Sequence, residues 1–226
     1  MENSSHFQIN DYLKPGRHAH LVGIGGVSMR PLGLVLRSMG MQISGSDMNA
    51  SVSTDELMAK GIAVSIGHRA ENIEGADCVI RTAAANNDNP EIAAARAAGI
   101  PIFERAQAWG YIMKAYRHAI CVSGTHGKTT TTSMLTQIFM EAGKDPTVMI
   151  GGSLPLLGAG HRVGQGDTII LESCEYCNSF LNFFPTTAVV LDIDADHLDF
   201  FKDLEDVKHS FRRFAELVPA DGLIVA

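Results

Sequence analysis

The stretch 121–132 reads Cys-Val-Ser-Gly-Thr-His-Gly-Lys-Thr-Thr-Thr-Thr, and it leaves few choices of fold for the residues around it. The apolar run from Ala119 to Val122 predicts a short buried strand, and an amphipathic helix is expected to follow from Thr130. A strand, a tight glycine turn and a helix in this order place backbone N–H groups at a helix N-terminus, where the helix dipole also favours an anion. The sequence therefore predicts a phosphate-binding loop.

The residues that open this helix suit a nucleotide. Lys128 is expected to reach the outer phosphates, and the Thr129 hydroxyl is expected to bind Mg2+. Val122 stands where the usual P-loop has its first glycine, so the loop is a shortened variant. A glycine turn without a ligand is the alternative, but it gives no reason for Lys-Thr at the helix start. The apolar helix face is expected to contain Met134, Leu135, Ile138, Phe139 and Ala142.

Composition excludes several classes of function. The chain has 226 residues, enough for two domains of common size, and 46% of them are hydrophobic. Its net charge is −7 and it has no block of Lys and Arg, which argues against nucleic acid as a main partner. No apolar run approaches the ~20 residues that a membrane span needs. The start of the chain lacks a signal-peptide pattern and the four cysteines are scattered, so the cytoplasm is the expected location.

A second glycine-rich turn lies near the start of the chain. An apolar strand from His18 leads into Gly-Ile-Gly-Gly-Val-Ser-Met at 23–29, a helix is expected to Met39, and a second strand ends in Gly-Ser-Asp at 45–47. This is close to a dinucleotide-binding fingerprint, although Ser28 replaces its third glycine. The turn alone leaves three uses open: binding NAD(P), binding another nucleotide diphosphate such as a UDP-sugar, and tight packing.

Strand and helix signals alternate through the first part of the chain, which predicts an α/β domain with a Rossmann-like parallel sheet and helices on both faces. Further strands are expected at 62–66, 76–81 and 100–103, and helices at 54–60, 90–98 and 106–116. The pattern restarts between Glu104 and His118, which predicts one domain over residues 1–105 and a second over residues 106–226. Gly25, Asp47, residues 82–89 and Glu104-Arg105 follow strands and are expected on one rim of the first sheet.

The second domain is predicted to be a P-loop ATPase α/β domain. Strands are expected at 147–150, 168–171, 188–191 and 223–226, a glycine-rich loop at 153–166, and a helix from Leu204 to Val218. Acids follow two of these strands, at Glu172 and Glu175 and at 192–199, where His197 also lies. Thr129 with Glu172 is a candidate Mg2+ site, and His197 with Glu172 is a candidate second site that also suits Mn2+. Acids that only solvate loop ends are the alternative.

Several segments together resemble the Mur ligases, ATP-dependent amide-forming enzymes of peptidoglycan synthesis. They are Gly-Thr-His-Gly-Lys-Thr-Thr-Thr at 124–131, the turn at 23–29, Ser-Gly-Ser-Asp at 44–47, Asn-Pro-Glu at 89–91, Glu-Ser-Cys-Glu-Tyr-Cys-Asn-Ser-Phe-Leu at 172–181 and Asp-His-Leu-Asp at 196–199. The first-domain segments are similar to the branch that adds L-alanine to UDP-N-acetylmuramate. The resemblance runs from about Ala19 to Ala226, and it implies that this chain holds the first domain and about half of the central domain of a three-domain ligase. It also implies that the chain alone does not ligate.

The resemblance assigns roles residue by residue. The UDP-sugar is expected to contact Gly25, Gly26, Val27, Ser28, Ser46, Asp47, Thr82, Asn89, Arg105 and His126. The ATP phosphates are expected to contact Gly124, Thr125, His126, Gly127, Lys128, Thr129 and Thr130, and the catalytic residues are Lys128, Glu172 and His197.

The reaction that the resemblance implies is phosphoryl transfer from ATP to the substrate carboxylate, followed by attack of the L-alanine amine on the acyl phosphate. Two Mg2+ ions are expected to assist. One departure is that Asp192 stands where the family usually has asparagine, which adds a carboxylate near the expected metals. A ligase for recycled murein peptide, an NAD-dependent oxidoreductase and a non-catalytic nucleotide-binding module remain as alternatives.

Overall fold

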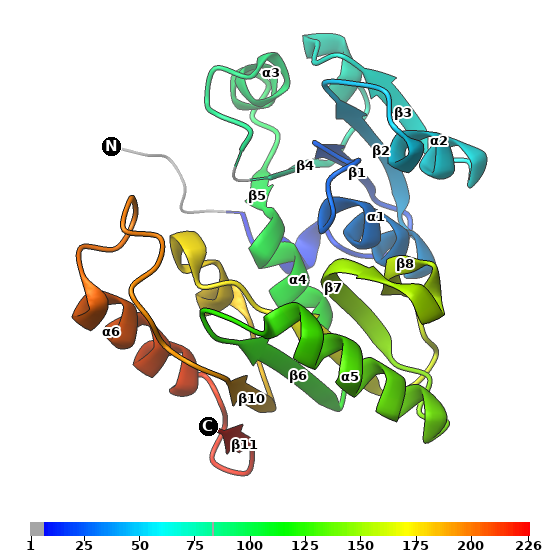
Figure 1. Cartoon of the computed structure of the whole chain (residues 1–226). Helices are drawn as coiled ribbons and strands as arrows, with labels where there is room; N and C mark the ends of the chain where they lie inside the picture. The colour runs from blue at the N-terminus through cyan, green and yellow to red at the C-terminus, as the bar shows by residue number, and fades with distance from the viewer. Residues whose placement is uncertain (1–6, 83) are drawn as a thin grey trace. The chain divides into compact units, whose positions relative to one another are not determined.

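The computed structural model describes residues 7–82 and 84–226. The chain divides into two compact units, Met1–Ala108 and Trp109–Ala226, and each unit has its own sheet (Figure 1). The division falls within the helix α4 (Arg105–Met113). None of the described helices is long and apolar enough to cross a membrane.

The first unit is built on a sheet of five parallel strands in the order β3-β2-β1-β4-β5. The strands are β1 (His18–Val22), β2 (Gln42–Asp47), β3 (Ala63–Ile66), β4 (Cys78–Arg81) and β5 (Ile102–Glu104). Strand order reverses between β1 and β4, so the segments after these two strands flank the crevice where open α/β sheets bind ligands. The predicted parallel α/β architecture is confirmed.

The helices of this unit bury apolar faces against the sheet. They are α1 (Met29–Ser38), α2 (Val52–Ala59), α3 (Pro90–Ala97) and α4, with short 3-10 segments at Ile9–Asp11 and Ala70–Ile73. Leu32, Val35 and Leu36 of α1 are almost fully buried. Asn89 is the N-cap of α3, and its side chain accepts hydrogen bonds from the N–H groups of Glu91 and Ile92.

The expected start of α2 was wrong by two residues. The sequence predicted a helix from Thr54, but the helix begins at Val52 and its N-cap is Ser51. Ser51 accepts from the Thr54 N–H, and the Thr54 side chain accepts from the Ser51 N–H. This reciprocal pair satisfies two N–H groups at the helix start, which fixes the boundary.

The second unit has a six-stranded sheet in the order β11-β10-β6-β9-β7-β8. Its strands are β6 (His118–Ser123), β7 (Thr147–Leu154), β8 (Ala159–Arg162), β9 (Thr168–Glu172), β10 (Thr187–Val190) and β11 (Leu223–Val225). All neighbouring strands pair in parallel except β7 and β8. The strand β6 lies between β10 and β9 and is parallel to both. The segments that follow these three strands therefore start at the same edge of the sheet.

The stretch 153–166 is not the loop that the sequence predicted. The strand β7 continues to Leu154, a 3-10 turn at Pro155–Leu157 reverses the chain at Gly158, and β8 returns antiparallel. Glycine makes this pairing possible, because a Cβ on Gly160 would meet the carbonyl oxygens of Ile150 and Gly152. Short glycine-rich strands lack the apolar run on which the prediction relied.

The helix α5 (Lys128–Glu141) lies along β6, β7 and β9 (Figure 1), but its predicted face is partly wrong. Leu135 and Phe139 pack on the core, whereas Met134 and Ile138 are exposed and Thr132 and Thr136 are buried. The two threonine hydroxyls donate to the carbonyls of Lys128 and Thr132, so these polar groups are satisfied within the helix and can be buried.

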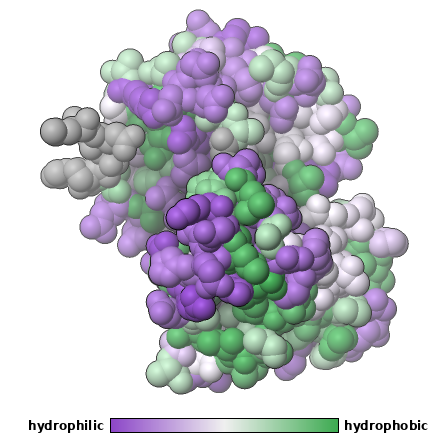
Figure 2. All heavy atoms as spheres, turned by 60° about the vertical axis from the view of Figure 1, so that its left-hand side comes forward, coloured by the Kyte–Doolittle hydropathy of each residue, from purple (hydrophilic) through white to green (hydrophobic). Residues whose placement is uncertain are grey.

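The last helix, α6 (Leu204–Ala215), has the expected apolar face. Its Phe211 and Phe214 are buried and contact the ring of Phe180, with the rings of Phe180 and Phe214 stacked at 4.5 Å. The helix ends three residues before the predicted Val218. Figure 2 shows that hydrophobic side chains also reach the surface among hydrophilic ones on one face of the molecule, and large exposed hydrophobic residues include Phe184, Leu198 and Phe200.

Candidate active site

The phosphate-binding loop of the second unit has the geometry that its glycines suggested. It follows β6 and enters α5 at Gly127, the N-cap residue. Gly124 has φ 136° and Gly127 has φ 79°, backbone conformations that favour glycine. Within the described part of the chain, the N–H groups of Gly127, Lys128 and Thr129 have no hydrogen-bond acceptor. They lie at a helix start, where a phosphate can accept from them.

Asp192 supports this loop from the neighbouring strand β10. Its carboxylate accepts a hydrogen bond from the His126 N–H at 2.8 Å, and its carbonyl accepts from the Thr125 N–H at 3.1 Å. A Cβ on Gly124 would lie 3.0 Å from the same carboxylate oxygen. The carboxylate that departs from the family pattern therefore shapes the loop, while the side chain of His126 is exposed.

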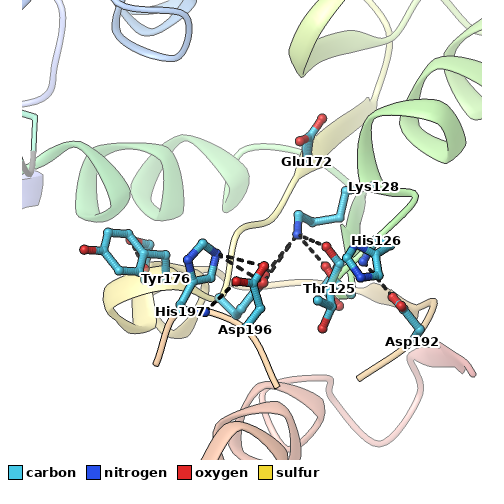
Figure 3. A network of polar contacts seen from close by, with 12 residues as sticks. Thr125, His126, Lys128, Glu172, Tyr176, Asp192, Asp196 and His197 are labelled. Carbon is cyan, nitrogen blue, oxygen red and sulfur yellow. Dashed lines mark hydrogen bonds and ion pairs between the residues drawn. The ribbon is translucent and has the colours of Figure 1, made fainter. Parts of the chain in front are cut away.

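Lys128 and His197 share one buried carboxylate. Lys128 Nζ donates to the carbonyls of Gly124 and Thr125 and lies 3.2 Å from an oxygen of Glu175, and His197 Nε2 lies 3.7 Å from the other oxygen (Figure 3). Glu175 is only 1% exposed. The sequence marked Glu175 as an acid at a strand end but did not include it among the catalytic residues. Its only signal was its position three residues after Glu172, beyond a strand that neighbours β6.

Thr129 and Glu172 come together as predicted for a metal site. Thr129 Oγ1 donates to Glu172 Oε1 at 3.0 Å, and Glu172 Oε2 accepts from the Gly151 N–H at 2.7 Å. A Cβ on Gly151 would collide with the Glu172 carboxylate, so glycine is needed where β7 approaches β9. Two ligand oxygens of the kind that Mg2+ prefers thus lie beside the first turn of α5.

His197 is held by a set of contacts separate from those of Thr129 and Glu172. It has φ 53°, its N–H donates to Asp196, and its ring lies 4.7 Å from the ring of Tyr176. The Tyr176 hydroxyl donates to Asp199, and this hydrogen bond raises the pKa of Tyr176 to about 12. The Glu172 carboxylate points away from the His197 ring (Figure 3).

Among the described residues, no three His, Cys, Asp or Glu side chains form a metal-binding group, and no hydrogen bond or ion pair joins His197 to Glu172. The structure therefore brings together the expected ligands of the first ion but not those of the second. A second ion between Glu172 and His197 stays a prediction.

In the first unit, the glycine turn is tied to the end of β2. The N–H groups of Gly23 and Ile24 donate to the Ser46 carbonyl at 2.8 and 2.9 Å, and the Gly25 N–H donates to Asp47 at 2.9 Å. A Cβ on Gly25 would lie 2.9 Å from that Asp47 oxygen. The predicted acid at the end of the second strand therefore braces the turn.

The other residues predicted for the UDP-sugar lie in three settings. Thr82, after β4, is close enough that a Cβ on Gly23 would lie 2.9 Å from its methyl group, and Val27 is 57% exposed. Ser46 is fully buried, and Asn89 caps α3. The remaining residues lie where helices begin or at the turn itself: Ser28 is the N-cap of α1, Arg105 opens α4, and Gly26 donates to the Gly23 carbonyl.

Two domain models cover almost all of the chain. Residues 18–117 match the model described as Mur ligase family, catalytic domain, and residues 122–226 match the model described as Mur ligase middle domain. The chain belongs to the Mur ligase family. Both glycine turns lie inside these matches, one in each.

Curated relatives and solved structures agree with this family. A UDP-N-acetylmuramate–L-alanine ligase of Clostridium botulinum (strain Hall) is 48% identical over 217 residues, which are 96% of this chain and 47% of that protein. The protein of the same name from Acetivibrio thermocellus is 50% identical over 210 residues, 93% of this chain and 45% of that protein. The chain thus spans about half the length of these Mur ligases.

Two solved Mur ligase structures superpose equally well. The UDP-N-acetylmuramate–alanine ligase of Thermotoga maritima has a TM-score of 0.83 at 30% identity, over 92% of this chain and 48% of that one. The UDP-N-acetylmuramate:L-alanyl-gamma-D-glutamyl-meso-diaminopimelate ligase of Neisseria meningitides has a TM-score of 0.83 at 28% identity, over 92% of this chain and 70% of that one. The predicted fold class and family resemblance are confirmed.

Proposed function

We propose that this chain is the nucleotide-binding part of an ATP-dependent ligase that joins L-alanine to UDP-N-acetylmuramate in peptidoglycan precursor synthesis. The observation that carries the proposal is the glycine loop at 124–127, which ends in Lys128 and lies between two strands whose ends supply acids. Glu172 ends β9 and Glu175 follows it on one side, and Asp192 and His197 follow β10 on the other. Two relatives at 48% and 50% identity carry this activity in their names.

The residues of the loop have separate parts in this reaction. The N–H groups of Gly127, Lys128 and Thr129 bind phosphate oxygens of ATP. Lys128 Nζ moves from Glu175 and the loop carbonyls to the outer phosphates, where it counters the charge that builds up during transfer. The reaction moves the terminal phosphoryl group of ATP to the substrate carboxylate. The amine of L-alanine then displaces phosphate and forms the amide.

Thr129 and Glu172 fit a magnesium ion, since their oxygens lie 3.0 Å apart beside the expected phosphates. Bound there, Mg2+ supplies positive charge that neutralises the transferring group. Gly151 holds the Glu172 carboxylate from the other side and keeps it in place. A nitrogen ligand from His197 also suits Mn2+, and this second ion belongs to the proposal.

The first unit is proposed to bind the UDP-sugar. The turn at 23–26 and Thr82 flank the crevice between β1 and β4, and Asp47 braces the turn. We propose that Gly25, Gly26, Val27 and Ser28 contact the UDP group with their backbone. Ser46 and Asn89 have an indirect role in this proposal: the buried Ser46 holds the turn through its carbonyl, and Asn89 caps α3. The cytoplasmic location expected from the sequence stays a prediction.

A ligase that attaches recycled murein peptide to the same UDP-sugar is the second candidate. The observation in its favour is the Neisseria meningitides structure, which superposes with the same TM-score as the alanine ligase. The two candidates share ATP and the UDP-sugar, and they differ only in the amine. Product analysis by mass spectrometry on a full-length ligase that contains this chain, with L-alanine and with the tripeptide L-alanyl-γ-D-glutamyl-meso-diaminopimelate offered separately, distinguishes them.

Calorimetry on the 226-residue chain tests the proposal. We expect heat of binding with UDP-N-acetylmuramate and with a non-hydrolysable ATP analogue in the presence of Mg2+, and none with NADH. Binding of NADH without binding of UDP-N-acetylmuramate would support an oxidoreductase instead. The Lys128→Ala variant is the control for the loop, because it should weaken binding of the ATP analogue and leave binding of the UDP-sugar unchanged.

A further inference from the structure

One buried carboxylate in the first unit is surrounded by side chains from four other segments. Glu91, in the first turn of α3, has a fully buried side chain. Around it stand four polar side chains: His20 from the middle of β1, Ser46 from β2, His68 from the segment after β3, and Asn72 from the 3-10 segment Ala70–Ile73. None of these contacts belongs to the ATP site.

Both oxygens of the carboxylate have polar contacts. Glu91 Oε2 accepts from the Ser46 hydroxyl at 2.6 Å and lies 3.2 Å from His68 Nδ1, and Glu91 Oε1 accepts from the Asn72 amide. His20 is 1% exposed, and its Nε2 lies 3.7 Å from Glu91 Oε2 without a hydrogen-bond partner in the described residues. Burying an ionised carboxylate is costly unless polar groups surround it. The four surrounding groups, each on a different segment, therefore stabilise the ionised form of Glu91.

The carboxylate acts on the glycine turn through one intermediate residue. Ser46 donates its hydroxyl to Glu91 and accepts the N–H groups of Gly23 and Ile24 at its carbonyl. The next residue, Asp47, accepts the N–H of Gly25. Glu91 therefore fixes the end of β2, and the end of β2 fixes the backbone of the turn.

We propose that Glu91 is a positioning residue for the UDP-sugar site, which holds the turn at 23–26 in its binding geometry through Ser46. This inference rests on the proposed function for the identity of the ligand. It assigns two roles to the Asn-Pro-Glu segment. Asn89 caps the start of α3, and Glu91 connects that helix to the turn through its hydrogen bond with Ser46. The proline between them leaves no N–H to be satisfied at the first helical residue.

Hydrogen exchange on the 226-residue chain tests the link directly. Glu91→Met keeps the length of the side chain but removes both acceptors, and Glu91→Gln keeps one of them. We expect the amides of Gly23 and Ile24 to exchange at least ~10-fold faster in Glu91→Met, with Glu91→Gln between it and wild type, because hydrogen bonds to a charged acceptor are stronger than those to a neutral one. Amides in the middle of β1 report the overall stability of the unit, and their rates should rise by a smaller factor than those of Gly23 and Ile24.

Binding of UDP-N-acetylmuramate, measured by calorimetry, gives the second readout. Its Kd should rise about tenfold or more in Glu91→Met, whereas the Kd of the ATP analogue at the loop of the second unit should not change. Ser46→Ala removes the intermediate hydroxyl without removing the carboxylate, and it should have an effect that does not add to that of Glu91→Met. Glu74→Gln, at an exposed acid in the same unit, is the matched control and should behave as wild type.

The outcomes separate this inference from the proposed function. Unchanged exchange at Gly23 and Ile24 in both Glu91 variants overturns the inference. An increase at Gly23 and Ile24 that is no larger than the increase in the middle of β1 also overturns it, because it indicates only a loss of stability. Additive effects of Ser46→Ala and Glu91→Met also overturn it. If wild type fails to bind UDP-N-acetylmuramate while the turn still loosens in the variants, the proposed function fails and the control of the turn by Glu91 stands.

Discussion

At the scale of single residues, Glu175 sets the resting position of the P-loop lysine. Its carboxylate is buried and lies 3.2 Å from Lys128 Nζ, so it occupies the place in the lysine's contacts that the proposed function gives to an outer phosphate. An anionic ligand must therefore compete with Glu175 for the lysine. The sequence could not reveal this, because Glu172 and Glu175 both follow the same strand and only their distances to Lys128 and Thr129 separate their roles.

The variant Glu175→Gln tests that competition. Removing the charge should strengthen binding of the non-hydrolysable ATP analogue about tenfold, because an ion pair with Lys128 and a repulsion of the phosphates are both lost. Calorimetry on the 226-residue chain measures the Kd. Glu205→Gln is the control, since Glu205 forms an exposed ion pair with Lys208 and should leave the Kd unchanged. Weaker binding in Glu175→Gln would show that this carboxylate assists the nucleotide instead.

Glu91 makes the free energy of unfolding of the first unit depend on pH in the acidic range. Burial raises the pKa of Glu91, but its polar contacts with His20, Ser46 and Asn72 outweigh burial and bring the pKa to about 2. A lowered pKa in the folded state means that the stabilisation is present above the ordinary value of 4.5 and is lost as the pH falls towards 2. The difference corresponds to on the order of 3 kcal/mol.

We therefore expect wild type to lose more free energy of unfolding between pH 5 and pH 3 than Glu91→Gln, which has no group to protonate at this position. Urea unfolding at several pH values, followed by a probe in the first unit, measures the two slopes. Equal slopes would mean that the ionised state of Glu91 adds no stability. Glu74→Gln again serves as the control, since Glu74 is exposed.

At the scale of helices and strands, prediction from sequence succeeded where burial leaves a continuous apolar run. Parallel strands such as β6 and β9 are buried along most of their length, so each contains an uninterrupted hydrophobic run, Ala-Ile-Cys-Val in β6 and Ile-Ile-Leu in β9. It failed at the β7–β8 hairpin, whose strands contain glycines and pair through close backbone contact. It also failed on one side of α5, because Thr132 and Thr136 satisfy their hydroxyls inside the helix and take buried places that hydrophobic residues were expected to fill.

The missed hairpin matters for the site, because it carries Gly151 to the Glu172 carboxylate. A Cβ at Gly151 would meet the carboxyl carbon of Glu172 at 2.8 Å, so Gly151→Ala should push this carboxylate away from Thr129. Disturbing the support of a metal ligand typically costs ~10- to 100-fold in metal affinity. We expect Mg2+ to strengthen binding of the ATP analogue much less in Gly151→Ala than in wild type.

The matched control for Gly151→Ala lies in the same hairpin. Gly158 has φ 61° and no atom within 4 Å of a Cβ, and asparagine tolerates this backbone conformation. Gly158→Asn should therefore keep the wild-type response to Mg2+. An equal response to Mg2+ in Gly151→Ala and Gly158→Asn would remove Glu172 from the proposed metal site.

At the scale of the whole molecule, the chain consists of two compact units that each place a glycine turn at the end of a parallel strand. The turn at 23–26 accepts support from Asp47, the last residue of β2, and the turn at 124–127 from Asp192, just after β10. In both turns a backbone N–H donates to a carboxylate at the end of the neighbouring strand. The helices after the two turns begin with different residues. Lys128 and Thr129 open α5, whereas Met29 and Arg30 open α1, and the Arg30 guanidinium is paired with Glu56 at 2.7 Å.

This difference predicts that the two turns bind different ligands, and hydrogen exchange can map each ligand to its unit. UDP-N-acetylmuramate should slow exchange at residues 23–28 and leave residues 127–130 unchanged. The ATP analogue with Mg2+ should do the reverse, because Lys128 and Thr129 open the helix after the second turn, whereas the cation after the first turn, Arg30, is paired with Glu56. NADH should slow neither segment. Protection of residues 23–28 by NADH would favour the dehydrogenase interpretation of the first turn, and protection of them by the ATP analogue would place the nucleotide in the other unit.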